Sequence, residues 1–288
     1  SLRPVLVRDV RDKGDRPWRP AGTRMNASKS IMRLSQCRSG RERPRIAHVI
    51  NSIGLGGVPE AAFQMLRVLP RDRYDCFLRV MKPLDANDAN RSARLARFRN
   101  LDISVSFAEP TENRHGRMAA TAHWLESERI DLLHCHSYKP NVSARLAGTL
   151  LRPNGLRIVA HYHNQYDANW QRDGTLDLDR LLAQQTDSMI AVSGSVRSHI
   201  VERLRIAPER VALIPNGVDL ARFVSRQAKW EARQALGWPV DRPIIGLAGR
   251  ISEQKGQEDL VRAAPAVLAA IPDALIVLAG APDEPEGL

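Results

Sequence analysis

Residues 244–256, Ile-Ile-Gly-Leu-Ala-Gly-Arg-Ile-Ser-Glu-Gln-Lys-Gly, give the clearest indication of the fold. The apolar run Ile244–Ala248 precedes a loop with Arg250 and Lys255, and an amphipathic segment, Gln257–Ile271, follows. This order predicts a strand, a loop and a helix. Ligands of parallel sheets bind beyond the carboxyl ends of strands, where helix N-termini attract anions. The two cations therefore suit a diphosphate, although solvated surface residues are the alternative interpretation.

Upstream, from Arg45 onward, short apolar runs alternate with amphipathic segments. This alternation predicts an α/β fold with a parallel sheet covered by helices on both faces. The expected strands are Ile46–Asn51, Cys76–Met81, Ile103–Phe107, Leu132–His136, Arg157–His163, Ser188–Val192, Val211–Ile214, Ile244–Gly249 and Ala274–Gly280. The expected helices are Pro59–Leu69, Ala89–Asn100, Arg117–Glu128, Asn141–Leu151, Leu178–Gln185, Val196–Leu204 and Gln257–Ile271, with Ser193 and Gly194 at the start of the sixth.

The same pattern predicts how the chain is divided. Residues 44–218 form a first Rossmann-like domain, 219–240 a linker or helix, and 241–288 the start of a second domain. The last segment holds a single β-α-β unit, whereas a complete domain of this kind needs about 100–150 residues. The second doubly wound domain is therefore expected to be incomplete.

Most of the net charge of +11 belongs to the N-terminal segment. Residues 1–45 hold 13 of the 43 Lys and Arg but only four of the 32 Asp and Glu. This excess, without apolar periodicity, predicts a disordered basic tail over residues 1–43. Such a tail can bind nucleic acid or anionic lipid. The start at Ser1, with Met25 and Met32 inside the tail, instead favours an over-extended reading frame, and no nucleic-acid partner is expected.

Cysteine usage and hydropathy indicate the compartment. Cys37, Cys76 and Cys135 are scattered and odd in number, so neither a disulfide framework nor zinc spacing follows, and a reducing cytoplasm is the natural interpretation. No run of about 18 apolar residues occurs, so no transmembrane helix is expected. A peripheral contact with a membrane stays open.

Two further segments suit ligand-binding loops. Gly54-Leu-Gly56-Gly57 follows the first expected strand, and its glycines would permit positive φ and close approach of backbone N–H groups to a phosphate or sugar. A tight turn without a ligand is the alternative, and the full dinucleotide spacing is missing. Ile214-Pro-Asn216-Gly217-Val-Asp219 contains an Asn and a Gly that suit a left-handed interdomain turn.

Four of the eight histidines cluster at two expected strand ends. His134 and His136 flank Cys135, and His161 and His163 flank a tyrosine, so alternation places each pair on one face of its strand. Histidines satisfied by the backbone, a metal site and substrate contacts are the three interpretations. A metal site is disfavoured because no carboxylate or second cysteine completes the ligand set.

Taken together, the glycine-rich loop, the Ile214–Asp219 segment and the Gly249–Gly256 loop resemble the retaining glycosyltransferases of family 4, the group 1 glycosyl transferases with the GT-B fold. The resemblance runs from about Arg45 to the last residue and implies two Rossmann-like domains. It implies transfer of a sugar from a nucleotide-diphosphate donor to a glycan or lipid-linked hydroxyl acceptor, as in polysaccharide biosynthesis. It implies no cofactor and no metal.

The resemblance also implies roles for particular residues. Family members carry a functional histidine in a segment like Asp131–His136, so His136 is expected at the sugar, with His163 and Asn164 as an acceptor-side rim. Arg250 and Lys255 would stabilise negative charge on the departing diphosphate. The residues expected to contact donor or substrate are Gly56, Gly57, His163, Asn164, Asn216, Gly249 and Gly256.

The sequence departs from the family's pattern in one motif, and two other function classes stay open. The family's Glu-x7-Glu motif has no counterpart, and Asp283, Glu284 and Glu286 do not fit it, so the chain is expected to be a C-terminally truncated, inactive fragment. A sugar-nucleotide epimerase of the same architecture would share the diphosphate loop but need no acceptor. A non-catalytic nucleic-acid-binding protein would rest on the basic tail alone.

Overall fold

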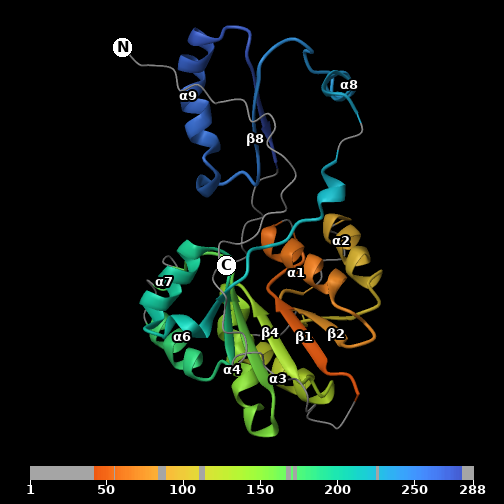
Figure 1. The fold of residues 1–288 in the computed structure, drawn as a ribbon, viewed down its shortest axis with the longest axis vertical. Helices are drawn as coiled ribbons and strands as arrows, with labels where there is room; N and C mark the ends of the chain where they lie inside the picture. The colour runs from red at the N-terminus through yellow and green to blue at the C-terminus, as the bar shows by residue number, and fades with distance from the viewer. Residues whose placement is uncertain are drawn as a thin grey trace, which may run out of the picture. The chain divides into compact units, whose positions relative to one another are not determined.

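The computed structural model describes residues 42–54, 56–83, 89–109, 114–166, 170, 174–224 and 227–280 (Figure 1). Almost all of the expected basic tail, and the three acids after position 282, lie outside the described residues. The described strands form two parallel sheets, one of seven strands and one of two. The α/β prediction with parallel sheets is therefore confirmed.

The larger sheet and its helices occupy residues 45–213. Its strands are β1 (Arg45–Ile50), β2 (Asp75–Val80), β3 (Ser104–Phe107), β4 (Leu132–His136), β5 (Arg157–Tyr162), β6 (Ser188–Ala191) and β7 (Val211–Leu213). Its helices are α1 (Gly57–Val68), α2 (Ala89–Arg99), α3 (Arg114–Ser127), α4 (Tyr138–Thr149), α6 (Thr175–Gln184) and α7 (Gly194–Leu204), with 3-10 turns η1 (Arg152–Asn154) and η2 (Pro208–Arg210). In Figure 1, α1 and α2 flank one side of this body and α6 and α7 the other.

The strand order, β3-β2-β1-β4-β5-β6-β7, makes this sheet doubly wound. The chain moves outward from β1 to β3, returns to β4 beside β1, and then moves outward in the opposite direction. Every pair is parallel, with His48 beside His134 and His136 beside His161 in the register. The order reverses between β1 and β4, and the crevice at such a switch point is where open α/β sheets bind ligands.

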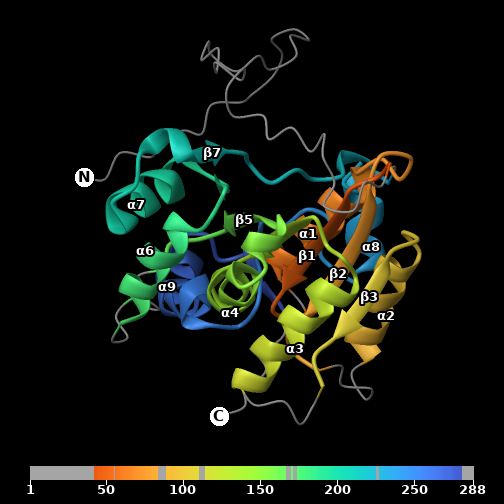
Figure 2. The same ribbon diagram turned by 90° about the horizontal axis from the view of Figure 1, so that it is seen from below.

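Strand alternation builds the core as two layers. Ala47 and Val49 of β1 point, with Leu133 and Cys135 of β4, to the face covered by α3 and α4, which lie side by side (Figure 2). Ile50 and its neighbours of β2 point to the face covered by α1 and α2. The approach of α4 to β4 is close: a Cβ on Gly148 would lie 2.6 Å from Leu133 Cδ2.

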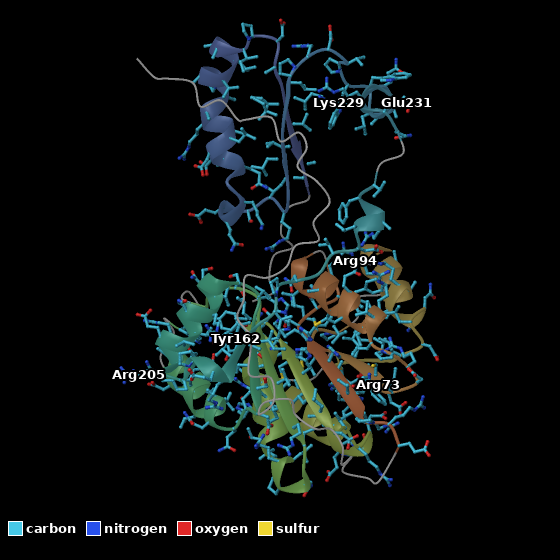
Figure 3. The ribbon with its side chains drawn as sticks, viewed as in Figure 1. Arg73, Arg94, Tyr162, Arg205, Lys229 and Glu231 are labelled. Atoms are coloured by element: carbon cyan, nitrogen blue, oxygen red, sulfur yellow. The ribbon has the colours of Figure 1, made fainter. Side chains whose placement is uncertain are left out.

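The smaller sheet pairs β8 (Ile244–Ala248) with β9 (Leu275–Ala279) across α9 (Gln257–Ala270), as the sequence predicts. Between the sheets the chain forms η3 (Leu220–Arg222) and α8 (Lys229–Ala235), and η4 (Glu253–Lys255) precedes α9. Lys229 and Glu231 of α8 are labelled in Figure 3. Of the described residues after 219, only Gln257 and Ala274 are buried, so this unit has little core.

The expected elements exist, with ends displaced by up to three residues, as is usual where helices fray. The predicted start at Ser193 is confirmed, since its hydroxyl accepts a hydrogen bond from Val196 N at 3.2 Å. The division into domains at 218/219 and 240/241 stays a prediction. Across the described part of the chain, no helix is long and apolar enough to span a membrane.

Candidate functional site

Five histidines gather on one face of the larger sheet, around the switch point. They are His48 on β1, His134 and His136 on β4, His161 on β5 and His163 just after it, and we call them the histidine column. The sequence indicated the last four by alternation. His48 was missed because it lies 86 positions before His134 and only the β1–β4 pairing brings the two together.

Hydrogen bonds join the rings of the column. His48 Nδ1 lies 2.9 Å from His136 Nε2, and His136 Nδ1 lies 3.2 Å from His163 Nε2. A second pair joins His134 Nε2 to His161 Nδ1 at 3.3 Å. In each pair one nitrogen must donate and the other accept, so the tautomers of neighbouring rings are coupled.

Burial keeps the column neutral. It lowers the pKa of His48 to about 4, with a further contribution from the charge of Arg71. Burial and then neighbouring histidines lower the pKa of His161 to about 3, and burial alone lowers that of His163 to about 4. The pKa values of His134 and His136 lie well below the ordinary range for the same reasons. Neutral imidazoles are hydrogen-bond partners and metal ligands rather than cations.

The burial of His136 bears on its expected role at the sugar. Its side chain is 0% exposed, and both of its ring nitrogens already face other histidines. The partly exposed ring is that of His163, and Asn164 beside it is exposed. The structure therefore places His163 and Asn164 at the rim of the sheet, with His136 directly beneath His163.

The backbone around His136 is strained. Ser137, which separates β4 from α4, has φ of 69°, a left-handed conformation uncommon for a residue other than glycine. Its N–H donates to His161 O at 3.0 Å, so this turn is tied to the end of β5. Strain of this kind often accompanies ligand sites, because surrounding contacts must hold it in place.

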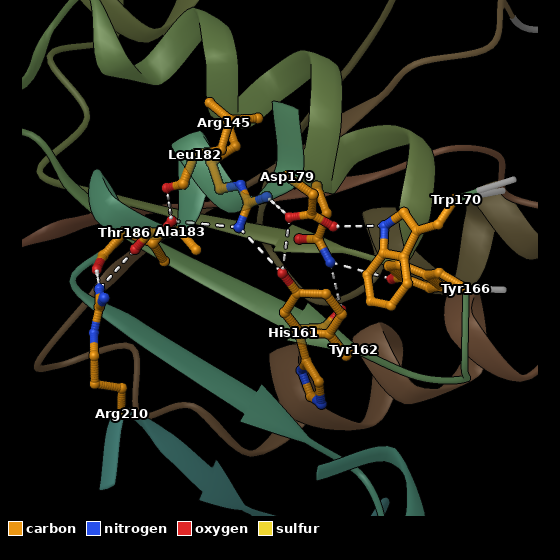
Figure 4. Close-up of polar contacts among 11 residues, drawn as sticks. Arg145, His161, Tyr162, Tyr166, Trp170, Asp179, Leu182, Ala183, Thr186 and Arg210 are labelled. Carbon is orange, nitrogen blue, oxygen red and sulfur yellow. Dashed lines mark hydrogen bonds and ion pairs between the residues drawn. The ribbon is translucent and has the colours of Figure 1, made fainter. Parts of the chain in front are cut away.

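A buried polar network supports the segment after β5 (Figure 4). Arg145 of α4 and Asp179 of α6 form a fully buried ion pair. Asp179 also accepts hydrogen bonds from Tyr162 Oη and Trp170 Nε1, both at 3.1 Å. Asn141 Nδ2 donates to the carbonyl of His161 at 3.1 Å and to Tyr166 Oη at 3.2 Å. The two helices thus hold both ends of the loop that carries the rim residues.

The glycine-rich loop lies between β1 and α1. The described glycines of this loop do not use the left-handed φ that glycine permits, since Gly56 has an extended φ of 163° and Gly57 is the first residue of α1. There is space beside the backbone of Gly57 for the close approach of a ligand, because a Cβ on Gly57 would meet nothing within 4 Å. The use of this space by a ligand stays a prediction.

The Gly249–Gly256 loop adopts the predicted strand-loop-helix form. Lys255 is exposed, and Arg250 is half-buried. Gly256 has φ of 70°, a conformation that favours glycine at this turn into α9. Gly249 packs against the aliphatic part of the Lys255 side chain. A Cβ on Gly249 would lie 3.7 Å from Lys255 Cγ.

Two residues that sequence reasoning missed hold this loop in place. The buried amide of Gln257 donates to Arg250 O at 2.6 Å and accepts from Ser252 N at 3.4 Å. Gly280, just after β9, approaches the backbone of Gly249 so closely that a Cβ would lie 1.8 Å from its carbonyl oxygen. The sequence shows Gln257 only as a polar residue directly after Gly256, and its burial is visible in the structure alone.

Asn216 and Gly217 lie on a segment where the expected left-handed turn was wrong. Neither residue has a positive φ, and both are exposed. The segment instead leads to η3, which ion pairs attach to α1: Asp219 to Arg67 at 3.1 Å and Arg222 to Glu60 at 2.7 Å.

Metal-ligand geometry among the described residues is confined to the histidine column. His48, His134 and His136 form one set, and His136, His161 and His163 form another. In each set, one ring nitrogen per residue lies within 4.8 Å of the others.

Comparison with known proteins identifies the family. The model of the family described as Glycosyltransferase Family 4 matches residues 55–222. UDP-Gal:alpha-D-GlcNAc-diphosphoundecaprenol alpha-1,3-galactosyltransferase of Escherichia coli is 23% identical over 252 residues, covering 84% of this chain and 63% of that protein. The chain thus spans less than two thirds of that relative.

Solved structures share the fold. Anabaena HepE (Alr3699), in complex with UDP-glucose, superposes with a TM-score of 0.67 at 20% identity, over 84% of this chain and 62% of HepE. UDP-GlcNAc 2-epimerase from Neisseria meningitidis, bound to UDP-GlcNAc, reaches 0.55 at 12% identity, over 81% and 64%. These likenesses show the GT-B fold, and the epimerase is the more distant of the two.

Proposed function

Because this chain belongs to glycosyltransferase family 4, we propose that it forms part of an enzyme that transfers a hexosyl group from a nucleotide-diphosphate donor to a hydroxyl acceptor with retention. The single observation that carries this proposal is the family match over residues 55–222, most of the larger sheet. The Gly249–Gly256 loop adds a cationic residue pair at a strand end, as a diphosphate requires.

The names of similar proteins support the choice of substrates. The Escherichia coli relative is named for UDP-Gal and an undecaprenol-linked acceptor, and HepE was solved with UDP-glucose. We therefore propose a nucleotide sugar as donor, a glycan or lipid-linked acceptor, and a place in polysaccharide biosynthesis. A cytoplasmic protein with a peripheral contact with the membrane would meet such an acceptor.

The reaction places its largest charge on the leaving diphosphate. As the bond from the sugar's anomeric carbon to the diphosphate oxygen breaks, negative charge grows on that oxygen. Arg250 and Lys255 would stabilise this charge, and Gly249 and Gly256 would let the backbone approach the phosphates. No cofactor takes part in this proposal. Donor-side roles for Gly56, Gly57 and Asn216 are proposed on the family resemblance alone.

The acceptor side would use the rim of the larger sheet. His163 and Asn164 are exposed enough to orient a hydroxyl group. His136 would act on the sugar only if its ring turned away from His48 or His163, since both ring nitrogens face these residues.

Product analysis tests the proposal. The full-length protein, incubated with a UDP-sugar and a lipid-linked sugar acceptor, should release UDP and form an acceptor glycoside. NMR of the new linkage should show the anomeric configuration of the donor. Conversion of the nucleotide sugar to an epimer without acceptor would support the epimerase instead. An inverted linkage would refute retention.

A further inference from the structure

The histidine column contains more ring nitrogens than the described protein satisfies. Nε2 of His48, Nε2 of His161 and Nδ1 of His163 are buried and have no hydrogen-bond partner among the described residues. Leaving a polar group in this state costs about 1–3 kcal/mol. One of the three, His161 Nε2, belongs to a set of histidines that could hold a metal ion, and a bound ion would give this atom a partner.

The spacing of one set suits a metal ion. His136 Nδ1 and His163 Nε2 are 3.2 Å apart. Two nitrogens on a tetrahedral Zn²⁺, each about 2.0–2.1 Å from the metal, are separated by about 3.3 Å. A metal can therefore replace the proton that these two rings share without moving β4 from β5. His161 belongs to the same set, with its ligand nitrogen within 4.8 Å of the other two, and its Nε2 is one of the unpartnered atoms.

The two remaining rings are placed to orient the ligands. With His136 Nδ1 on the metal, His136 Nε2 carries the proton and donates to His48 Nδ1 at 2.9 Å. With His161 Nε2 on the metal, His161 Nδ1 donates to His134 Nε2 at 3.3 Å. Hydrogen bonds from the second nitrogen of a ligating histidine fix its tautomer in this way in known metal sites.

The chemistry of the column selects the kind of metal. Neutral imidazoles suit Zn²⁺, Ni²⁺, Co²⁺ and Cu²⁺, whereas Mg²⁺ and Ca²⁺ need oxygen ligands that the set does not contain. His163 is partly exposed, which gives an ion a route of entry.

We propose that His136 Nδ1, His161 Nε2 and His163 Nε2 bind one divalent transition-metal ion, with Zn²⁺ as the typical occupant, and that His48 and His134 orient two of these ligands. The sequence disfavours a metal here because no carboxylate or second cysteine completes the ligand set. The fold adds His48 and converts the pairs into a connected set. The site lies within the larger sheet and uses His136 and His163, which the proposed acceptor side also uses. Metal binding is measured without sugar transfer, so the two proposals can fail separately.

The test measures metal binding by the 288-residue chain. Metal-free protein in a Cys37→Ser background, which removes a thiol outside the described residues, is titrated with Zn²⁺ in competition with a chromogenic chelator. We expect one equivalent per chain. His161→Gln and His163→Gln should each weaken binding about 100-fold or more, because loss of a ligand exceeds the 10–100-fold effect of losing an outer-shell partner. The matched control is His115→Gln with His123→Gln, two exposed histidines outside the column, and it should leave the affinity unchanged.

X-ray absorption of the zinc-loaded Cys37→Ser protein keeps the proposal testable if the glutamine variants fail to fold. The expected spectrum shows three imidazole nitrogens at about 2.0–2.1 Å. The proposal is overturned by an absence of stoichiometric binding, by equal weakening in the control variant, or by fewer than two imidazoles around the zinc. Absence of binding would also indicate that water satisfies the three unpartnered nitrogens.

Discussion

At the scale of single residues, the Gly249–Gly256 loop shows how a charged motif depends on an uncharged neighbour. Arg250 and Lys255 supply the expected charge, but the backbone that carries Arg250 is held by the side chain of Gln257. Gly280 is needed for a different reason, since only a residue without Cβ fits against Gly249 O. The cations are therefore positioned by residues that carry no charge.

The charge of the loop can be tested directly. In the full-length protein, Arg250→Ala and Lys255→Ala should each raise the activation free energy for transfer by roughly 2–4 kcal/mol, because a contact that strengthens in the transition state is lost. The measurement is kcat/KM with the donor varied. The control is Arg262→Ala on α9, whose exposed side chain pairs with Glu258. Rates within about threefold of the parent for both variants would refute the diphosphate role.

Gln257→Ala tests the support of the loop. The change removes hydrogen bonds to Arg250 O and from Ser252 N, so the two backbone groups lose a partner that is buried. We expect a loss of about 1–3 kcal/mol in the stability of the smaller unit. Hydrogen exchange of amides in residues 249–257 should quicken. Gln254→Ala, at an exposed position of η4, should leave exchange unchanged; equal effects of the two substitutions would contradict the assignment.

At the scale of elements, α4 and α6 are joined through charge rather than apolar contact alone. The Arg145–Asp179 pair is fully buried, and Asp179 also accepts from Tyr162 and Trp170. Tyr162, labelled in Figure 3, lies inside the body of the larger sheet. Removing one partner of such a pair leaves the other charge buried and uncompensated.

Asp179→Ala should therefore lower the free energy of unfolding by about 3–5 kcal/mol. Urea denaturation followed by tryptophan fluorescence measures the loss. Asp177→Ala is the matched control on the same helix, because Asp177 is largely exposed and its ion pair within the described part of the chain is with Arg180. Its effect should stay within about 0.5 kcal/mol. A similar loss of unfolding free energy in both variants would show that the buried ion pair contributes no more to stability than the exposed one.

Asp187 joins the starts of β5 and β6, and its ionisation gives a pH-dependent contribution. Burial raises its pKa, but hydrogen bonds from Arg152, the Ile158 N–H and Arg157 outweigh this and hold the pKa below its ordinary value. A depressed carboxyl pKa stabilises the fold above the ordinary value near 3.9 and loses that contribution as the pH falls through the folded value. Asp187→Asn should therefore flatten the acid limb of stability measured below pH 4. An unchanged acid limb would contradict this.

At the scale of the whole molecule, the two sheets differ in how many apolar side chains they bury. The larger sheet buries apolar residues on both faces, whereas α9 buries only Gln257 among its residues. Val261, Leu268 and Leu278 are exposed, so the smaller unit shows apolar side chains on both its helix and its strand. Parallel strands normally need cover on both faces.

Limited proteolysis should reflect this difference. In the 288-residue chain, a protease of broad specificity should first cut within residues 219–288 and leave a resistant core that starts near Arg45. The physical reason is that local opening costs little where few apolar contacts are lost. Mass spectrometry of the fragments identifies the cuts. Early cuts inside residues 45–213 would show that the larger sheet is the labile part.

Local patterns in the sequence were enough to predict the elements and the family. The periods of apolar residues gave each strand, and each helix except α8, to within three positions, because a strand's alternation and a helix's stripe are properties of neighbouring residues. The cap at Ser193 was likewise local. The glycine-rich loop lies where the sequence predicts it, between β1 and α1, and open space beside Gly57 rather than positive φ distinguishes its glycines.

The sequence by itself therefore determined the parallel α/β architecture, the loop with Arg250 and Lys255, and membership of glycosyltransferase family 4. Only the tertiary structure decided that His48 joins the other histidines, that His136 is buried beneath His163, and that Arg145 meets Asp179. These contacts depend on strand order and helix packing across tens of residues. Local periodicity does not predict these contacts. The strands β1 and β4 become neighbours only because the chain returns from the edge strand β3 to the middle of the sheet.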